Sequence, residues 1–192
     1  MIKGYYEKKA YEYEEKRQGT IWNNENRAIK MLLAKERDIE GLILDIPCGT
    51  GRYFEMYESL NLSYIGIDIS QDMIDIAQKR ITADIGKCIE GNIWELNRED
   101  LPDLDVIVVS RYLHWLDSQQ CNSLIDKLIG LSPKQIIFTD IISPISKKNP
   151  SKTHVHSFEE FNSYTSSLNI TDIIILNRDI KDKLNVMVGA KL

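Results

Sequence analysis

Two aspartates that follow short apolar runs stand close to glycines, in a spacing typical of a ligand site. Asp45 directly precedes the turn at residues 46–51, which reads Ile-Pro-Cys-Gly-Thr-Gly, and Asp68 ends the next apolar run. Glycine lets a turn take positive φ and lets a ligand lie against bare backbone. A carboxylate beside such a turn repels phosphate and attracts an ammonium or sulfonium group, while a second carboxylate can accept hydrogen bonds from a ribose diol. The pattern predicts a ligand that carries both a positive charge and a sugar.

The elements that position these acids alternate along the chain. Apolar runs at 42–44, 64–68, 87–90, 106–109 and 135–139 predict strands. Helical patterns fall at 22–36, 54–56, 70–77, 119–128 and 156–168. Such alternation predicts a parallel sheet covered on both faces, with ligands beyond the carboxyl ends of the strands. Four polar residues follow strands at that edge: Asp45, Asp68, Asn92 and Ser110. The runs at 173–176 and 184–188 are joined by a short turn and predict an antiparallel hairpin.

Length and charge narrow the class of protein. A chain of 192 residues is most simply one domain. Residues 41–133 hold 15 acids and 7 bases, a net charge of −8, which is a poor surface for nucleic acid. No apolar run is long enough to cross a membrane, and residues 1–7 lack the apolar core of a signal peptide. Three cysteines without a CxxC pair argue against a disulfide framework or a zinc site, so we expect a cytoplasmic protein.

Four motifs occur in order at the predicted sheet edge, and together they resemble those of the class I S-adenosylmethionine-dependent methyltransferases. Residues 45–51 resemble the first motif, with Pro47 where glycine is commoner. Residues 66–70 with Met73 resemble the second, and 91–93 resemble the third, with Asn92 in place of the more usual Asp. Residues 104–116 resemble the fourth strand and the loop that faces the transferred methyl group. The resemblance covers about residues 5–192, including the reversed last strand.

This resemblance implies an α/β fold: a doubly wound, mostly parallel seven-stranded sheet with a reversed C-terminal strand, the Rossmann-like methyltransferase fold. Residues 1–40 would form a helical N-terminal lid segment, and residues 41–192 the core. The implied cofactor is S-adenosyl-L-methionine. The residues implied to contact it are Asp45, Pro47, Gly49, Gly51, Asp68, Ile69, Met73, Asn92, Ile93 and Ser110.

Methyl transfer requires mainly that nucleophile, methyl and sulfur be aligned and that water be excluded. A general base is needed only if the acceptor must lose a proton, and His114 is the candidate, with a structural role as the alternative. Arg111 either clamps an acidic group of the substrate or pairs with an acid such as Asp117. The residues expected to contact the substrate are Tyr6, Tyr13, Trp22, Arg111, Trp115 and His156. His154 and His156 lack a third metal ligand, so we predict no metal site.

The predicted function is therefore methyl transfer to a small-molecule acceptor, with neither nucleic acid nor a membrane as partner. Two alternatives stay open. A methyltransferase-like subunit could bind the cofactor without activity of its own, and a nicotinamide-dependent oxidoreductase could use a related sheet. Asp45 and the reversed hairpin speak against the oxidoreductase. The identity of the acceptor, the atom that is methylated and the oligomeric state are not encoded in these motifs.

Overall fold

The computed structural model describes residues 20–35, 41–82, 84–144, 147–148, 153–178 and 183–192. Its helices are α3 (Thr20–Lys35), α4 (Phe54–Ser59), α5 (Gln71–Gln78), α6 (Ser118–Gly130) and α7 (Phe158–Thr165). Three short 3₁₀ helices are η1 (Ile93–Glu95), η2 (Arg98–Asp100) and η3 (Leu113–Trp115). The strands are β1 (Leu42–Asp45), β2 (Ser63–Asp68), β3 (Gly86–Glu90), β4 (Val106–Val109), β5 (Gln135–Ser143), β6 (Lys147–Lys148), β7 (His154–Ser157), β8 (Asn169–Arg178) and β9 (Leu184–Lys191).

The body of the sheet has the strand order β3-β2-β1-β4-β5-β9-β8. Strands β1 to β5 run parallel to one another, whereas β9 pairs antiparallel with β5 and β8 pairs antiparallel with β9. These seven strands confirm the predicted fold, including the reversed C-terminal strand and the hairpin. The carboxyl ends of β1 to β4 consequently meet at one edge of the sheet.

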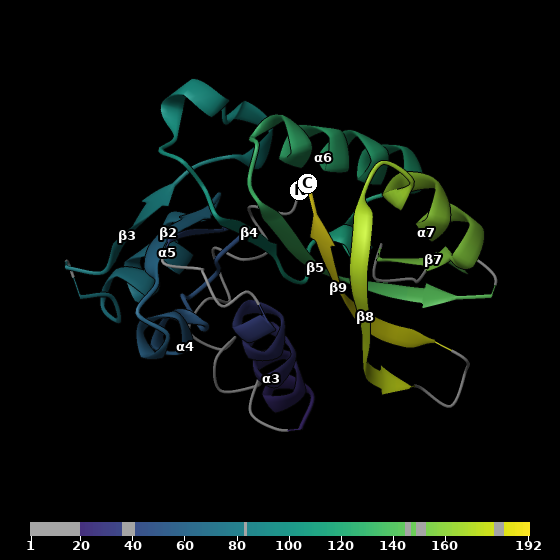
Figure 1. Cartoon of the computed structure of the whole chain (residues 1–192), viewed down its shortest axis with the longest axis horizontal. Helices are drawn as coiled ribbons and strands as arrows, with labels where there is room; N and C mark the ends of the chain where they lie inside the picture. The colour runs from purple at the N-terminus through teal and green to yellow at the C-terminus, as the bar shows by residue number, and fades with distance from the viewer. Residues whose placement is uncertain (1–19, 36–40, 83, 145–146, 149–152, 179–182) are drawn as a thin grey trace.

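Helices cover both faces of this sheet (Figure 1). On one face, α3, α4 and α5 bury side chains that include Ile29, Leu32, Phe54, Tyr57 and Ile74. On the other face, α6 and α7 bury a second set that includes Leu124, Ile125, Leu128, Phe161 and Tyr164. Full burial of one such leucine or isoleucine side chain contributes about 1.5–3 kcal/mol of transfer free energy. The two apolar layers therefore fix the sheet from both sides, as the continuous apolar strands predict.

The segment before α7 differs from its prediction. The sequence pattern predicts one helix from His156 to Leu168, but the chain forms β7 and then α7. β7 pairs in parallel with the end of β5, where Ile142 lies opposite His156, and β6 pairs antiparallel with β7. The helix begins after Ser157 because a capping box defines its N-terminus. The Glu160 carboxylate accepts from the Ser157 N–H at 2.6 Å, and the Ser157 hydroxyl accepts from the Glu160 N–H at 3.0 Å.

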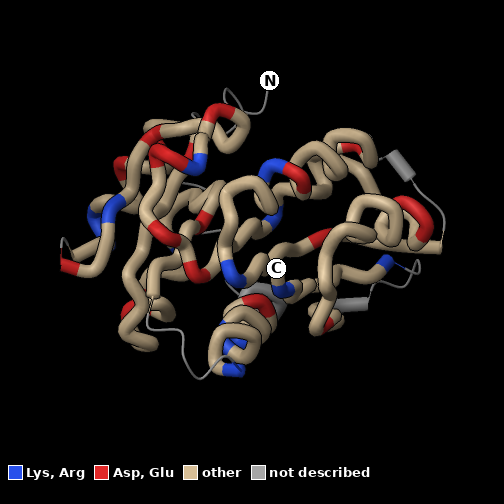
Figure 2. The backbone as a smooth tube through the Cα atoms, turned by 45° about the horizontal axis from the view of Figure 1, so that its top comes forward, with Lys and Arg blue, Asp and Glu red and all other residues tan. Residues whose placement is uncertain are grey.

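Acidic and basic positions are interspersed along the described chain, without a continuous basic stripe (Figure 2). Among the described helices, none is long and apolar enough to cross a membrane.

Candidate active site

Predicted site residues stand at the carboxyl edge of four adjacent strands. Asp45 and Asp68 are the last residues of β1 and β2, Asn92 follows β3 by two positions, and Ser110 directly follows β4. Because these strands are parallel neighbours in the sheet, the fold brings the four residues to one edge, as the sequence predicts.

The glycine-containing loop after β1 leaves open space over part of its backbone. Gly49 has φ of +56°, and a Cβ atom built there would meet no heavy atom within 4 Å. At Gly51, with φ of +72°, a Cβ atom would lie 3.2 Å from the Cβ of Ala77 in α5. Asp68 anchors the loop by accepting a hydrogen bond from the Gly49 N–H at 2.9 Å. A ligand can therefore approach the backbone at Gly49, whereas Gly51 allows the loop to pack on α5.

Asp45 is fully buried, and within the described part of the chain neither of its carboxylate oxygens has a partner in good hydrogen-bond geometry, although the Tyr57 hydroxyl lies near enough to lower its pKa. Burial raises the pKa of Asp45 well above its ordinary value, and the nearby Arg52 guanidinium offsets only part of that rise. A buried polar group without its hydrogen bonds costs about 1–3 kcal/mol, and more when it is charged. An ammonium group of a ligand would supply the missing donors, so this carboxylate fits the amino-acid end of S-adenosylmethionine.

The Asp68 carboxylate is buried but well supplied with donors. Its Oδ1 atom accepts from the Ser70 N–H at 3.0 Å, in addition to the bond from Gly49. Burial raises the pKa of Asp68, and the hydrogen bonds from the Ser70 and Gly49 N–H groups oppose this rise. Each carboxylate oxygen has further lone pairs, which leaves acceptor capacity for a sugar diol. Asp68 thus both orders the loop and retains the chemistry predicted for it.

The other predicted cofactor contacts lie around this edge at different depths. Pro47 and Ile69 are half-buried, Met73 and Ile93 are buried, and Asn92 is half-buried. Asn92 caps η1 by accepting a hydrogen bond from the Trp94 N–H at 3.2 Å. Its side chain is therefore held at the end of β3, next to the buried Ile93.

A buried cluster joins α3 to two loops of the site. Glu25 of α3 is fully buried and lies 2.5 Å from Arg52 Nη2 in the glycine loop and 2.5 Å from Arg111 Nε after β4. The Tyr53 hydroxyl donates to Glu25 at 3.2 Å and lies 2.8 Å from the Ser110 hydroxyl. We call these five residues the Glu25 cluster. It connects α3 to the glycine loop after β1 and to the loop at residues 110–116.

Arg111 pairs with an acid, which is one of the two roles predicted for it. The acid, however, is Glu25 and not Asp117, which instead caps α6 and accepts from the Gln120 N–H at 2.8 Å. Arg111 has φ of +59°, and its N–H donates to the Thr139 hydroxyl at 2.7 Å. This backbone turn directs the arginine towards α3, a partner that no local sequence pattern indicates.

The candidate base lies further along the same loop. His114 and Trp115 belong to η3, are half-buried, and have ring centroids 5.5 Å apart. The Trp94 indole N–H donates to the Tyr112 hydroxyl at 3.1 Å and so links the loops that follow β3 and β4. The loop at 110–116 therefore carries Ser110, Arg111, His114 and Trp115 together, next to the cofactor loop.

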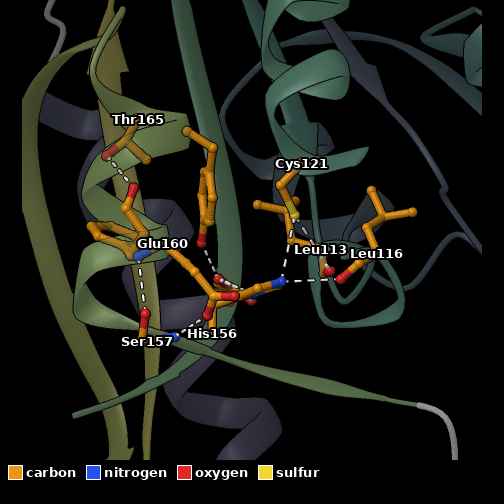
Figure 3. Close-up of polar contacts among 10 residues, drawn as sticks. Leu113, Leu116, Cys121, His156, Ser157, Glu160 and Thr165 are labelled. Carbon is orange, nitrogen blue, oxygen red and sulfur yellow. Dashed lines mark hydrogen bonds and ion pairs between the residues drawn. The ribbon is translucent and has the colours of Figure 1, made fainter. Parts of the chain in front are cut away.

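His156 lies behind this loop. It is 1% exposed, and its ring nitrogens contact the Asp140 carboxylate and the Leu116 carbonyl (Figure 3). Its contacts with the site therefore run through the backbone of the loop. Tyr6 and Tyr13 lie outside the described residues, and Trp22 belongs to α3 but its side chain is outside the description.

Sequence reasoning missed Glu25, Tyr53 and Asp140, although two of them carried a signal. Glu25 precedes Ile29 by four residues and Leu32 by seven, which places an acid on the apolar stripe of its helix. Asp140 follows Phe138 by two residues on a continuous apolar strand, so it shares that residue's buried face. A charged residue at a core position indicates a buried partner. Tyr53 carries no comparable pattern.

The family comparison agrees with the motifs and their geometry. A family model described as "Methyltransferase domain" matches residues 44–132, which span β1 to the end of α6 and hold the glycine loop and the residues at all four strand ends. Residues 44–132 thus match the family of methyltransferase domains that the four motifs resemble. No curated protein sequence matches this chain significantly.

Solved structures share the fold of this chain at low sequence identity. Magnesium protoporphyrin IX methyltransferase from Synechocystis PCC 6803, with bound S-adenosylhomocysteine, is 13% identical at a TM-score of 0.78, covering 99% of this chain and 97% of that one. Geranyl diphosphate C-methyltransferase from Streptomyces coelicolor A3(2) is 12% identical at a TM-score of 0.64, and the match covers 86% of this chain and 80% of that one. The 4+2 cyclase SpnF is 15% identical at 0.67, also covering 86% and 80%. The fold thus also occurs in a protein that is named for another reaction.

Proposed function

We propose that the protein transfers the methyl group of S-adenosylmethionine to a small-molecule acceptor. The observation that carries this proposal is the buried Asp45 carboxylate, which has no well-formed hydrogen bond among the described residues, only the nearby Tyr57 hydroxyl and Arg52 charge, and stands next to a glycine loop that is open at Gly49. A site built for phosphate would not bury an unpaired negative charge there, because the two charges would repel each other.

The cofactor supplies an electrophilic methyl group on a positively charged sulfur. In the proposed complex, Asp45 holds the ammonium group, Gly49 admits the chain of the ligand, and Asp68 accepts from the ribose hydroxyls. Asn92 meets the adenine amine. The remaining proposed contacts are Pro47, Gly51, Ile69, Met73, Ile93 and Ser110. These residues bind and orient, which is the main requirement of an in-line displacement.

The loop at residues 110–116 is the proposed acceptor side. His114 would take a proton from an acceptor that must lose one, and Trp115 and Arg111 would line the acceptor's position. Two of the structural neighbours are named for magnesium protoporphyrin IX and geranyl diphosphate, both small molecules. The acidic middle of the chain also favours a small molecule over nucleic acid.

We further propose that residues 1–40 act as a lid segment on a core of residues 41–192. The contact of Glu25 with both site loops supports this division. We also propose that the protein acts in the cytoplasm, which three buried free cysteines support.

Calorimetric titration with S-adenosylmethionine and S-adenosylhomocysteine tests the function. We expect both to bind, no binding of NAD or NADH, and release of S-adenosylhomocysteine when a pool of candidate small molecules is supplied. Asp45→Asn should weaken binding about 10- to 100-fold, the range for loss of a charge-assisted hydrogen bond. The same variant should leave the cofactor-free protein as stable or more stable, because an amide costs less to bury than an ionised carboxylate.

Asp103→Asn is the matched control, because Asp103 is fully exposed and its ion pair with Arg98 lies at the surface, away from the site. It should change neither the affinity nor the stability. Wild-type protein that binds neither methionine-derived ligand would refute the proposed function. Binding without formation of S-adenosylhomocysteine from any acceptor would favour the cofactor-binding subunit.

A further inference from the structure

A second buried cluster lies on the opposite face of the sheet, around His156 of β7 (Figure 3). His156 Nδ1 lies 2.9 Å from Asp140 Oδ2, and His156 Nε2 lies 3.0 Å from the Leu116 carbonyl oxygen. The Tyr164 hydroxyl donates to the same Asp140 carboxylate. The Cys121 sulfur lies 3.7 Å from Nε2, and its S–H donates to a second carbonyl of the loop. His156, Asp140, Tyr164 and Cys121 form what we call the His156 cluster.

The partners of His156 determine where its protons are. A backbone carbonyl can only accept, so Nε2 must carry a proton. An ionised carboxylate can also only accept, so Nδ1 must carry one as well. Acceptors facing both ring nitrogens are the arrangement that an imidazolium satisfies, because it donates from both. Cys121 does not resemble the nucleophile of a catalytic triad, because its thiol is fully buried and burial raises its pKa far above the ordinary value.

We propose that His156 is a positioning residue of this methyltransferase, whose doubly donating imidazolium holds the Leu116 carbonyl and thereby fixes the loop at residues 110–116. The role of that loop in methyl transfer rests on the proposed function, but the hydrogen bond from His156 to the loop does not. Leu116 is one residue beyond η3, and its N–H donates to the Leu113 carbonyl at 2.9 Å. Holding the carbonyl of Leu116 therefore holds the 3₁₀ turn that carries His114.

Charged and titratable groups from several elements surround His156. Asp140 comes from β5, Cys121 from α6, and Tyr164 and Glu160 from α7. His154 stacks on His156 along β7 with ring centroids 6.0 Å apart, and Asp117 caps α6 nearby. Burial opposes a charge on His156, but the hydrogen bond and the charge of Asp140 outweigh it and raise the pKa of His156 above its ordinary value. Acids are more numerous around His156 than positively charged groups, and their negative charge favours the imidazolium form.

Nitrogen-15 NMR of the full-length protein can test this protonation directly, since the chain has only three histidines. We expect both ring nitrogens of His156 to carry slowly exchanging protons at pH 7, with and without S-adenosylhomocysteine. We also expect amide exchange at Trp115 and Leu116, corrected for intrinsic rates, to quicken as the pH rises through the titration of His156. Asp140→Asn should shift this transition to lower pH.

Variants sharpen the test. His156→Gln should accelerate exchange at Trp115 and Leu116 roughly 10- to 100-fold, the range for loss of a charged hydrogen-bond donor. Glu159→Gln changes an exposed acid of α7 that does not face His156 and should leave these two amides unchanged. A singly protonated His156 ring at pH 7 would overturn the proposal. So would amide exchange rates at Trp115 and Leu116 that do not change as His156 titrates. If His156→Gln fails to fold, the wild-type ring and the Asp140→Asn titration still decide. None of these readouts requires that the cofactor binds.

Discussion

Two buried polar clusters hold the loop after β4 from opposite faces of the sheet. The Glu25 cluster contacts the first two residues of the loop, Ser110 and Arg111, and connects them to α3. The His156 cluster grips its end through the carbonyl of Leu116 and connects it to β7 and α7. One loop is thus held at both ends by largely buried polar groups, with Glu25, Asp140 and His156 at their centres, which constrain it more strongly than a surface ion pair would.

The two clusters differ in how they carry their charge. The Glu25 cluster relies on two arginines, which remain protonated throughout the working pH range. The His156 cluster relies on a histidine, whose charge depends on its surroundings. Their neighbours differ as well, because Asp45 near Arg52 has no well-formed hydrogen bond to its carboxylate among the described residues, whereas both polar ring atoms of His156 have partners. The carboxylate without well-formed hydrogen bonds therefore lies where the ligand is proposed to bind, whereas the hydrogen-bonded histidine lies behind the loop that it supports.

The largest expected effect comes from breaking the Glu25 cluster. Glu25→Gln removes the one negative charge between two arginines of this cluster and should lower the free energy of unfolding by about 3–5 kcal/mol, as for other buried ion pairs that lose a partner. It should also weaken S-adenosylhomocysteine binding, because Arg52 belongs to the cofactor loop. Urea denaturation and calorimetry measure the two effects.

An exposed acid serves as the control for this substitution. Glu55→Gln alters an exposed residue of α4 and should change stability by no more than about 0.5 kcal/mol. If Glu25→Gln were as mild as this control, the cluster would not fix α3 to the site, and the contrast between the two clusters would lose its basis.

The strand-end residues are predictable from the sequence because they depend on local order. Asp45, Asp68 and Ser110 follow strong apolar runs, Asn92 follows a weaker strand signal, and parallel neighbours bring such ends to one edge without further information. Pro47, Gly49 and Gly51 likewise indicate a turn by their own conformational limits. The sequence alone therefore places Asp45 and Asp68 at a common edge beside a ligand-accessible turn.

The two clusters are not predictable to the same degree, because their members come from distant segments. Glu25 meets Arg111 only after α3 folds against the glycine loop, and Asp140 meets His156 only through the pairing of β5 with β7. The helix predicted over 156–168 conceals that strand, since two histidines and a valine in 154–156 give only a short apolar alternation. An acid on an apolar stripe indicates a buried partner but does not name it.

A smaller effect separates the clusters by pH. The pKa of His156 is raised in the folded protein, so its stabilisation is complete below the unfolded pKa of about 6.5 and is lost as the pH rises through the folded value. Stability should therefore decline as the pH rises above about 6.5, the unfolded pKa, and Asp140→Asn should flatten this decline. The arginines of the Glu25 cluster add no slope over this range. Urea denaturation at each pH measures the profile, and an unchanged slope in Asp140→Asn would assign the decline to other groups.

The smallest expected effect concerns the outer end of α3. Lys35 pairs with Asp172 of β8, but half of the lysine side chain is exposed. This hydrogen bond lowers the pKa of Asp172, yet solvent and salt screen such a pair, which typically contributes about 0–1 kcal/mol. Lys35→Gln should therefore cost under about 1 kcal/mol in urea denaturation, and less at high salt. Asp172→Asn should give a similar loss that does not add to it. A large, salt-insensitive loss would mean that α3 is anchored mainly at β8, and Glu25 would then not be the contact that joins this helix to the site.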